Sequence, residues 1–181
     1  YNSQFTFATK APVHDLKKPT VVFIKDSVDD NRRYLKIKIT PNRTVNRYDI
    51  FANEKIAFWN FKANGAKQLE QKGAKMNRNG KKILSYYLVD NEPLEMEFTI
   101  DKLALFDMHL LESSFNLMSS PLFNMTPRAY WMMPTPFILN DAIIIKQRIK
   151  HTPQVTNRPA ALASQMTIGV ISSTKNIQEP T

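Results

Sequence analysis

Three segments of the chain alternate apolar and polar side chains with a period of two residues. They are residues 34–40 (YLKIKIT), 93–101 (PLEMEFTID) and 105–113 (LFDMHLLES). Successive side chains of a β-strand point to opposite faces of a sheet, so this period is typical of a strand that is buried on one side. We expect the inward side chains to be Leu35, Ile37, Ile39, Leu94, Met96, Phe98, Ile100, Phe106, Met108 and Leu110.

Further strands are expected wherever short apolar segments lie between turn signals. These segments are residues 20–26, 47–52, 54–63, 81–90 and 141–149. In the last of them, Ile143 and Ile145 should point inward. Asn-Gly pairs at 64–65 and 79–80 predict tight turns, while the polar residues 27–33 predict a broader turn. Since no segment has the period of an amphipathic helix, the fold class should be all-β, an antiparallel β-sandwich or jelly roll.

The length of 181 residues suits one domain, and 43% hydrophobic residues suffice for its core. We expect an extended lead-in at 1–19, a sandwich at 20–150 with a long Pro-rich loop before its last strand, and a linker-like tail at 151–181. The tail contains one candidate short strand at 166–172. No window reaches the roughly 20 apolar residues of a membrane helix. Because the chain starts with Tyr1 instead of Met, we expect it to be a piece of a longer protein.

The sequence offers little to catalysis. With no Cys, it has no disulfide, thiolate metal site or cysteine nucleophile. Its three histidines, His14, His109 and His151, lack metal-ligand spacing, so we expect no metal and no catalytic residue in this segment. We interpret Asp107 and His109 as an exposed pair. Two further acidic residues on one strand face, Glu95 and Glu97, are interpreted as part of a solvated surface.

The net charge of +9 is concentrated in residues 62–82, where seven basic residues stand against one acidic residue. This basic segment is a candidate contact with anionic lipid headgroups, or else a solvated hairpin without a partner. Without interleaved aromatic residues to stack on bases, it is not expected to bind nucleic acid. The candidate residues are Lys62, Lys67, Lys72, Lys75, Arg78, Lys81 and Lys82.

Trp59, Tyr130 and Trp131 form a candidate aromatic patch for a sugar ring or a peptide. The competing interpretation places these large side chains in the core and rim of the sandwich, where aromatic residues supply packing area. The aromatic residues 130–131 fall within the Pro-rich loop, in the stretch PRAYWMMPTPF at 127–137.

The region from the 93–100 strand to the chain's last expected strand resembles the closing part of the membrane-bound zinc peptidases of metallopeptidase family twenty-eight, a group dominated by aminopeptidases. The resemblance covers about residues 7–150, with KPTVVFIKD at 18–26 as its looser first half. Its most specific part is the MMPTPF loop followed by Asp and an aliphatic strand. The matching residues are Glu112, Ser114, Asn116, Leu117, Pro127, Arg128, Met132, Met133, Pro134, Pro136, Phe137, Asp141, Ile144 and Lys146.

The resemblance implies that this chain is the non-catalytic C-terminal domain of a multi-pass membrane protein, on the extracytoplasmic (periplasmic) side. The two zinc ions and the catalytic residues of such a peptidase belong to an upstream α/β domain, and no residue here corresponds to them. The implied partners are the upstream catalytic and membrane domains, and the implied roles are folding, substrate access or contact with the catalytic domain. A carbohydrate- or peptide-binding sandwich is the alternative function.

Overall fold

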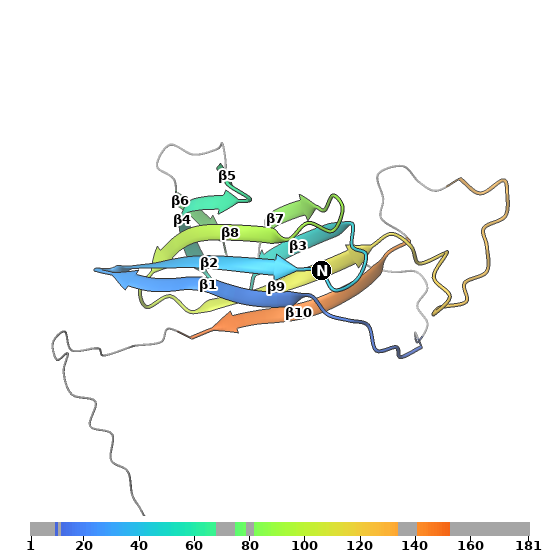
Figure 1. Cartoon of the computed structure of the whole chain (residues 1–181), viewed down its shortest axis with the longest axis horizontal. Helices are drawn as coiled ribbons and strands as arrows, with labels where there is room; N and C mark the ends of the chain where they lie inside the picture. The colour runs from blue at the N-terminus through green and yellow to red at the C-terminus, as the bar shows by residue number, and fades with distance from the viewer. Residues whose placement is uncertain (1–9, 11, 68–74, 79–81, 134–140, 153–181) are drawn as a thin grey trace, which may run out of the picture.

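The computed structural model describes residues 10, 12–67, 75–78, 82–133 and 141–152. These residues form two antiparallel β-sheets packed face to face, so the predicted all-β sandwich is confirmed (Figure 1). In the described part, every regular element is a strand, and no helix is present that could cross a membrane.

The first sheet has the order β1-β2-β8-β4-β5, with β6 also paired to β4. The second sheet has the order β10-β9-β3-β7. The chain therefore changes sheet several times, and strands that are distant in sequence become neighbours. The strand bounds are β1 Thr20–Asp29, β2 Arg32–Thr40, β3 Arg47–Ala52, β4 Ile56–Ala63, β5 Ala66–Lys67, β6 Lys75–Arg78, β7 Lys82–Tyr87, β8 Leu94–Asp101, β9 Phe106–Ser114 and β10 Ile143–His151.

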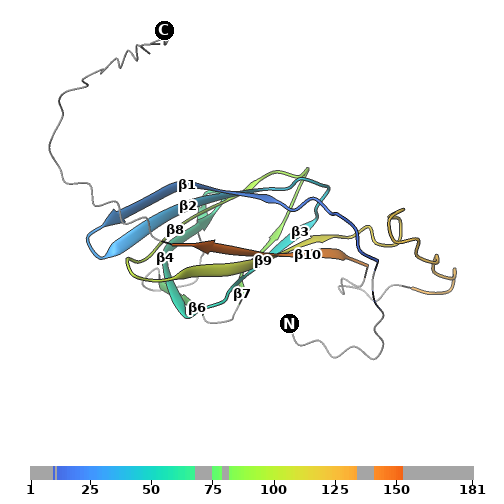
Figure 2. The ribbon, with the colours of Figure 1, turned by 90° about the horizontal axis from the view of Figure 1, so that it is seen from below.

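The strand register separates two ends of the sandwich. The β1–β2 turn and the β8–β9 turn lie at one end, because Arg32 pairs with Asp101. We call this the hairpin end. The opposite end, here the loop end, holds the described residues of the connections between β2 and β3, β7 and β8, and β9 and β10, namely 41–46, 88–93, 115–133 and 141–142 (Figures 1 and 2). The lead-in to β1 also lies at the loop end.

The core lies between the sheets, and all ten side chains predicted to point inward on the three alternating strands are buried. Ile143 and Ile145 of β10 are buried as predicted. Aromatic rings join the two layers, since Phe98 of β8 stacks on Phe106 of β9 with ring centroids 5.6 Å apart. The described part of the predicted Pro-rich loop, residues 115–133, contains no strand and follows β9, while residues 134–140 lie outside the described residues.

Two boundaries differ from the prediction. The polar residues 27–33 form only a two-residue turn, since β1 extends to Asp29 and β2 begins at Arg32. The side chain of Arg33 is fully buried, because Asp26 on the neighbouring strand neutralises its charge. At the C-terminal limit of the domain in sequence, β10 continues through His151, one residue beyond the expected limit of the sandwich. The second Asn-Gly turn at 79–80 and the candidate strand at 166–172 lie outside the described residues.

Candidate interaction site

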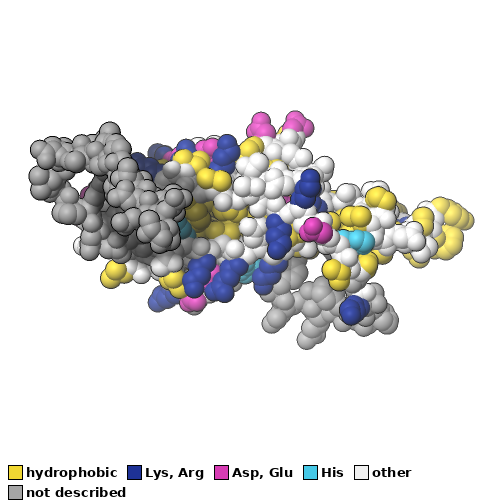
Figure 3. Space-filling model, turned by 60° about the horizontal axis from the view of Figure 1, so that its bottom comes forward, with side chains coloured by type: hydrophobic (Ala, Val, Ile, Leu, Met, Phe, Trp, Pro, Cys, Tyr) yellow, Lys and Arg dark blue, Asp and Glu magenta, His cyan; other side chains and the backbone are white. Residues whose placement is uncertain are grey.

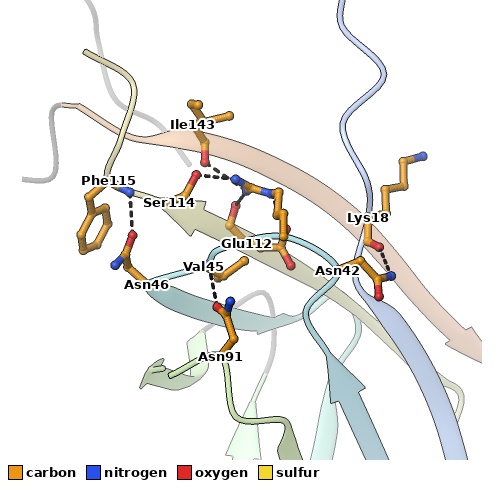
Figure 4. A network of polar contacts seen from close by, with 10 residues as sticks. Lys18, Asn42, Val45, Asn46, Asn91, Glu112, Ser114, Phe115 and Ile143 are labelled. Atoms are coloured by element: carbon orange, nitrogen blue, oxygen red, sulfur yellow. Dashed lines mark hydrogen bonds and ion pairs between the residues drawn. The ribbon is translucent and has the colours of Figure 1, made fainter. Parts of the chain in front are cut away.

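The base of the β9–β10 loop is held by Arg43, which lies in the β2–β3 connection. Its acceptor residues Glu112, Ser114 and Ile143 are labelled in Figure 4. The Nε of Arg43 donates to the Oε1 atom of Glu112 over 2.7 Å, and one Nη donates to the hydroxyl of Ser114. The other Nη lies 3.3 Å from the carbonyl oxygen of Glu112 and 3.4 Å from that of Ile143. One guanidinium thus connects the end of β9 to the start of β10, where the loop departs and returns.

Glu112 is fully buried within this network. Burial raises the pKa of its carboxyl above the ordinary value, while the nearby Arg43 acts in the opposite direction. Burial and the negative charge of Glu112 also raise the pKa of the neighbouring Tyr48 phenol. The charge of the buried Glu112 carboxylate is compensated by Arg43, so removal of Arg43 would leave a buried charge without a partner.

Additional hydrogen bonds and one ring contact brace the loop itself. The amide of Phe115 donates to the side-chain oxygen of Asn46 over 2.8 Å, and the amide of Leu117 donates to the carbonyl of Asp141 over 3.2 Å. Arg128, near the tip, forms an ion pair with the Asp141 carboxylate. The lead-in contributes His14, whose ring meets Phe123 edge-on at 5.1 Å. The loop is therefore attached at several points along its length.

Beyond these contacts, the tip of the loop exposes large apolar side chains (Figure 3). Tyr130 is 97% exposed, Trp131 69% and Met133 91%. The rings of Tyr130 and Trp131 lie 5.0 Å apart and nearly perpendicular, at 85°. They present an apolar projection instead of a flat platform.

The third residue of the predicted aromatic patch lies elsewhere. Trp59 is on β4, where it pairs with Thr99 near the hairpin end. Its half-buried ring is covered by the guanidinium of Arg32, whose central carbon is 3.5 Å from the ring centroid. The structure thus brings Tyr130 and Trp131 together, and places Trp59 at the other end of the sandwich.

The described members of the basic segment lie on strands of both sheets, and Lys62 of β4 pairs with Lys67 of β5. Lys62 is on β4 of the first sheet, 3.8 Å from a carboxylate oxygen of Glu97. Lys82 is on β7 of the second sheet, 3.0 Å from Asp49. Lys67, in the short strand β5, is exposed. Lys72 and Lys81 lie outside the described residues, and Lys75 and Arg78 are placed only by their backbone pairing with β4.

The predicted acidic residues Glu95 and Glu97 lie on the surface of the first sheet, where they form ion pairs with lysines. Glu95 and Glu97 of β8 both lie beside the ammonium of Lys36 on β2, at 3.1 and 3.0 Å. The Lys36 hydrogen bond lowers the pKa of Glu97. This cross-strand ladder of ion pairs accounts for both carboxylates without a catalytic role.

The prediction that Asp107 and His109 form an exposed pair is wrong. Asp107 is only 1% exposed, because Arg148 binds both carboxylate oxygens and Asn53 donates to one of them over 2.7 Å. These hydrogen bonds, led by that from Arg148, lower the pKa of Asp107 to about 2. His109 is half-buried, its ring stacked on Phe51 at 5.0 Å. Burial is the main cause that lowers the pKa of this imidazole.

Among the described residues, no group of three or more His, Cys, Asp and Glu side chains is placed to hold a metal ion. Sequence reasoning missed two arginines with structural roles, the fully buried Arg33 and the half-buried Arg43. The only signal for Arg43 was its place in a turn before a strand; its partner Glu112 is 69 residues away.

The fold and the braced loop define an all-β two-sheet sandwich domain that presents an apolar projection at one end. Comparison with protein-family models, with curated proteins and with solved structures finds no match to this chain.

Proposed function

We propose that this chain is a non-catalytic accessory domain, the C-terminal domain of a membrane-bound zinc-dependent aminopeptidase. The observation that carries the proposal is the mutual contact of residues that the sequence resemblance selected. Glu112 and Ser114 share the guanidinium of Arg43, the amide of Leu117 donates to the carbonyl of Asp141, and Arg128 binds the carboxylate of Asp141.

These contacts give the residues that match the family motif a structural role, and that role fits an accessory domain. They close the base of the β9–β10 loop and attach its tip, and none of them needs a substrate or a metal for its geometry. A motif with this role is expected in a domain that holds a loop toward a partner. The upstream catalytic and membrane domains are the proposed partners, with support of folding, substrate access or domain contact as the role. The two zinc ions of the parent and its catalytic residues are assigned to the upstream domain, on the extracytoplasmic side.

Two experiments test the proposal. The gene sequence upstream of the codon for Tyr1 should encode an α/β domain with the ligands for two zinc ions, followed by several membrane spans. The purified chain of 181 residues should contain no stoichiometric zinc by atomic emission and should not cleave aminoacyl-nitroanilides with zinc added. Bound zinc together with hydrolysis, or an upstream region with no peptidase domain, would refute it.

Carbohydrate or peptide binding is a second candidate, supported by the exposure of Trp131. A sugar ring usually packs on an open aromatic face, and the indole of Trp131 offers one beside the perpendicular ring of Tyr130. Titration against a glycan array and a peptide library, with Trp131→Ala as the matched variant, tests this candidate. No binding, or binding that the substitution leaves unchanged, would exclude the loop as such a site.

A further inference from the structure

Exposed apolar side chains are distributed unevenly over the molecule. Among the described residues, sixteen large hydrophobic side chains are exposed, and seven of them lie in the stretch from 115 to 133 of a single loop. Concentrations of exposed apolar side chains on a protein surface usually mark an interaction site. The seven are Phe115, Leu122, Met125, Tyr130, Trp131, Met132 and Met133.

We propose that the tip of the β9–β10 loop, residues 129–133, inserts into the interfacial layer of a lipid bilayer. The proposal goes beyond the accessory role above and does not depend on it. It rests on the residue types at the tip, on the shape of the tip, and on the basic residues of the lead-in.

The residue types suit the boundary between headgroups and acyl chains. Tyr and Trp combine an apolar ring with a polar group, and they are enriched where membranes meet water. Met132 and Met133 add flexible apolar side chains that adapt to a fluid environment. A turn closed by the hydrogen bond from the amide of Met132 to the carbonyl of Ala129, at 2.9 Å, holds these side chains together.

The shape of the tip favours a bilayer over a protein partner. The loop extends beyond the ends of β9 and β10 (Figures 1 and 2), and two side chains of the tip, Tyr130 and Met133, are 97% and 91% exposed. A stable protein interface usually buries about 800 Å² on each partner and needs a complementary surface. A few consecutive projecting side chains suit a fluid layer, which requires no matching hollow. Because Arg43 and Asp141 already fix the loop, insertion would require little additional ordering.

The lead-in, which contacts the loop through His14 and Phe123, carries basic side chains. The described lead-in carries Lys10, Lys17 and Lys18 against Asp15. Basic groups near a membrane surface attract anionic headgroups. The ion pair between Arg128 and Asp141 leaves little net charge on the loop itself. We therefore expect the apolar tip to supply most of the affinity and the lysines to increase it on anionic lipid.

Binding to vesicles tests the proposal with Trp131 as the reporter. In a Trp59→Phe chain, Trp131 is the single indole. With phosphatidylcholine vesicles its emission should shift to the blue, and lipids brominated near the top of the acyl chain should quench it. The chain should float with these vesicles, and more strongly when phosphatidylserine is added.

Two variants separate the tip from general hydrophobicity. In the chain with native Trp59, the triple change Trp131→Ser, Met132→Ser and Met133→Ser should lower the vesicle partition coefficient at least tenfold, because apolar burial is lost. Leu103→Ser is the matched control, since Leu103 is 90% exposed but lies in the β8–β9 turn at the hairpin end. It should leave partitioning unchanged.

Three outcomes would overturn the proposal. One is the absence of flotation with either lipid. Another is binding to phosphatidylserine vesicles alone that the triple change leaves intact, which would assign the contact to the basic segment 62–82. The third is a concentration-dependent dimer that the triple change dissociates while flotation is unaffected, which would make a second copy of the chain the occupant.

Discussion

Arg43 and Glu112 are 69 residues apart in sequence, and the Nε of Arg43 lies 2.7 Å from the carboxylate of Glu112. The carboxylate side chain is fully buried, and the arginine side chain is 15% exposed. Arg43 also bonds to the carbonyl of Ile143, so the pair fixes the distance between the two strands that carry the loop. The placement of the exposed tip thus depends on a buried charge.

The change Arg43→Met should destabilise the domain strongly. The apolar part of the side chain is retained, but the buried carboxylate of Glu112 loses its partner, at a cost of about 3–5 kcal/mol. Urea unfolding at pH 7, followed by tryptophan fluorescence, measures the loss. Without Arg43 the pKa of Glu112 should rise further. The folded state then binds the extra proton, so the loss should shrink as the pH falls toward the carboxyl's ordinary pKa.

Two further variants show whether the loss of stability in Arg43→Met comes from the unpaired charge of Glu112. Adding Glu112→Leu to Arg43→Met should recover part of the stability, because the buried charge disappears. Arg128→Ala breaks a more exposed pair on the same loop, with side chains 32% and 30% exposed, and should cost less than about 1 kcal/mol. Wild-type stability for Arg43→Met would contradict the prediction.

Asp26→Asn should be destabilising through Arg33, whose Nε and one Nη donate to the two carboxylate oxygens at 2.7 and 2.6 Å. The guanidinium is fully buried, so loss of the counter-charge should cost about 3 kcal/mol in the free energy of unfolding. His151→Phe keeps the ring that stacks on Phe23 at 4.0 Å but loses the 2.8 Å contact with Asp26. It should cost only about 1 kcal/mol. Urea titrations in which His151→Phe costs more than Asp26→Asn would disprove this ranking.

Asp107 should make the stability of the domain sensitive to acid. Its pKa falls from 3.8 to about 2 on folding, chiefly through Arg148. The folded state therefore binds fewer protons between these values, and stability present above pH 4 is lost as the pH falls toward 2. Since the Arg148 side chain is 63% exposed and solvent screens the pair, we expect a contribution of about 1 kcal/mol.

Asp107→Asn isolates this contribution. The variant should unfold more easily at pH 7, and the gap between its free energy of unfolding and that of the wild type should narrow between pH 4 and pH 2. Urea titrations at a series of pH values measure that gap. A constant gap over this range would contradict the assignment of the low pKa to Asp107.

The alternation of side chains predicted the buried faces of β2, β8 and β9 because an apolar side chain on a half-buried strand has only one favourable direction. The charged residues were less predictable. Arg33 and Asp107 are buried because a partner on another strand neutralises each of them, 7 and 41 residues away. Strand pairing, which local pattern does not determine, decides whether such a partner is present.

The candidate site was also predictable from the sequence only in part. The sequence drew attention to the stretch at 127–137, and the structure places Tyr130 and Trp131 together at its tip. Trp59 belonged to the same predicted patch but lies on β4, covered by Arg32. Aromatic type alone does not determine which face or end a side chain occupies. Likewise, nothing near Arg43 in sequence indicated that it holds the base of the loop.

Variants of the turn at Asn64 and Gly65 can separate two contributions to stability, backbone strain at positive φ and side-chain hydrogen bonding. Both residues have positive φ, 45° and 79°, as the Asn-Gly pair predicted. A methyl group on Gly65 would meet nothing within 4 Å, so Gly65→Ala should cost about 1 kcal/mol from the backbone alone. Asn64→Gly suits the backbone but loses three side-chain hydrogen bonds. Two run from Nδ2, to the Tyr86 hydroxyl at 2.7 Å and the Pro93 carbonyl at 3.3 Å, and one runs from the Glu95 amide to Oδ1 at 2.6 Å.

Asn64→Ala combines the backbone strain with the lost bonding, because alanine tolerates positive φ poorly and makes none of the three hydrogen bonds. It should therefore be the most destabilised of the three variants, by about 2–3 kcal/mol in the free energy of unfolding. Urea titrations of the three chains under one set of conditions give the ranking. If Gly65→Ala proved as destabilising as Asn64→Ala, the three side-chain hydrogen bonds would contribute nothing, and the turn would depend on backbone conformation alone.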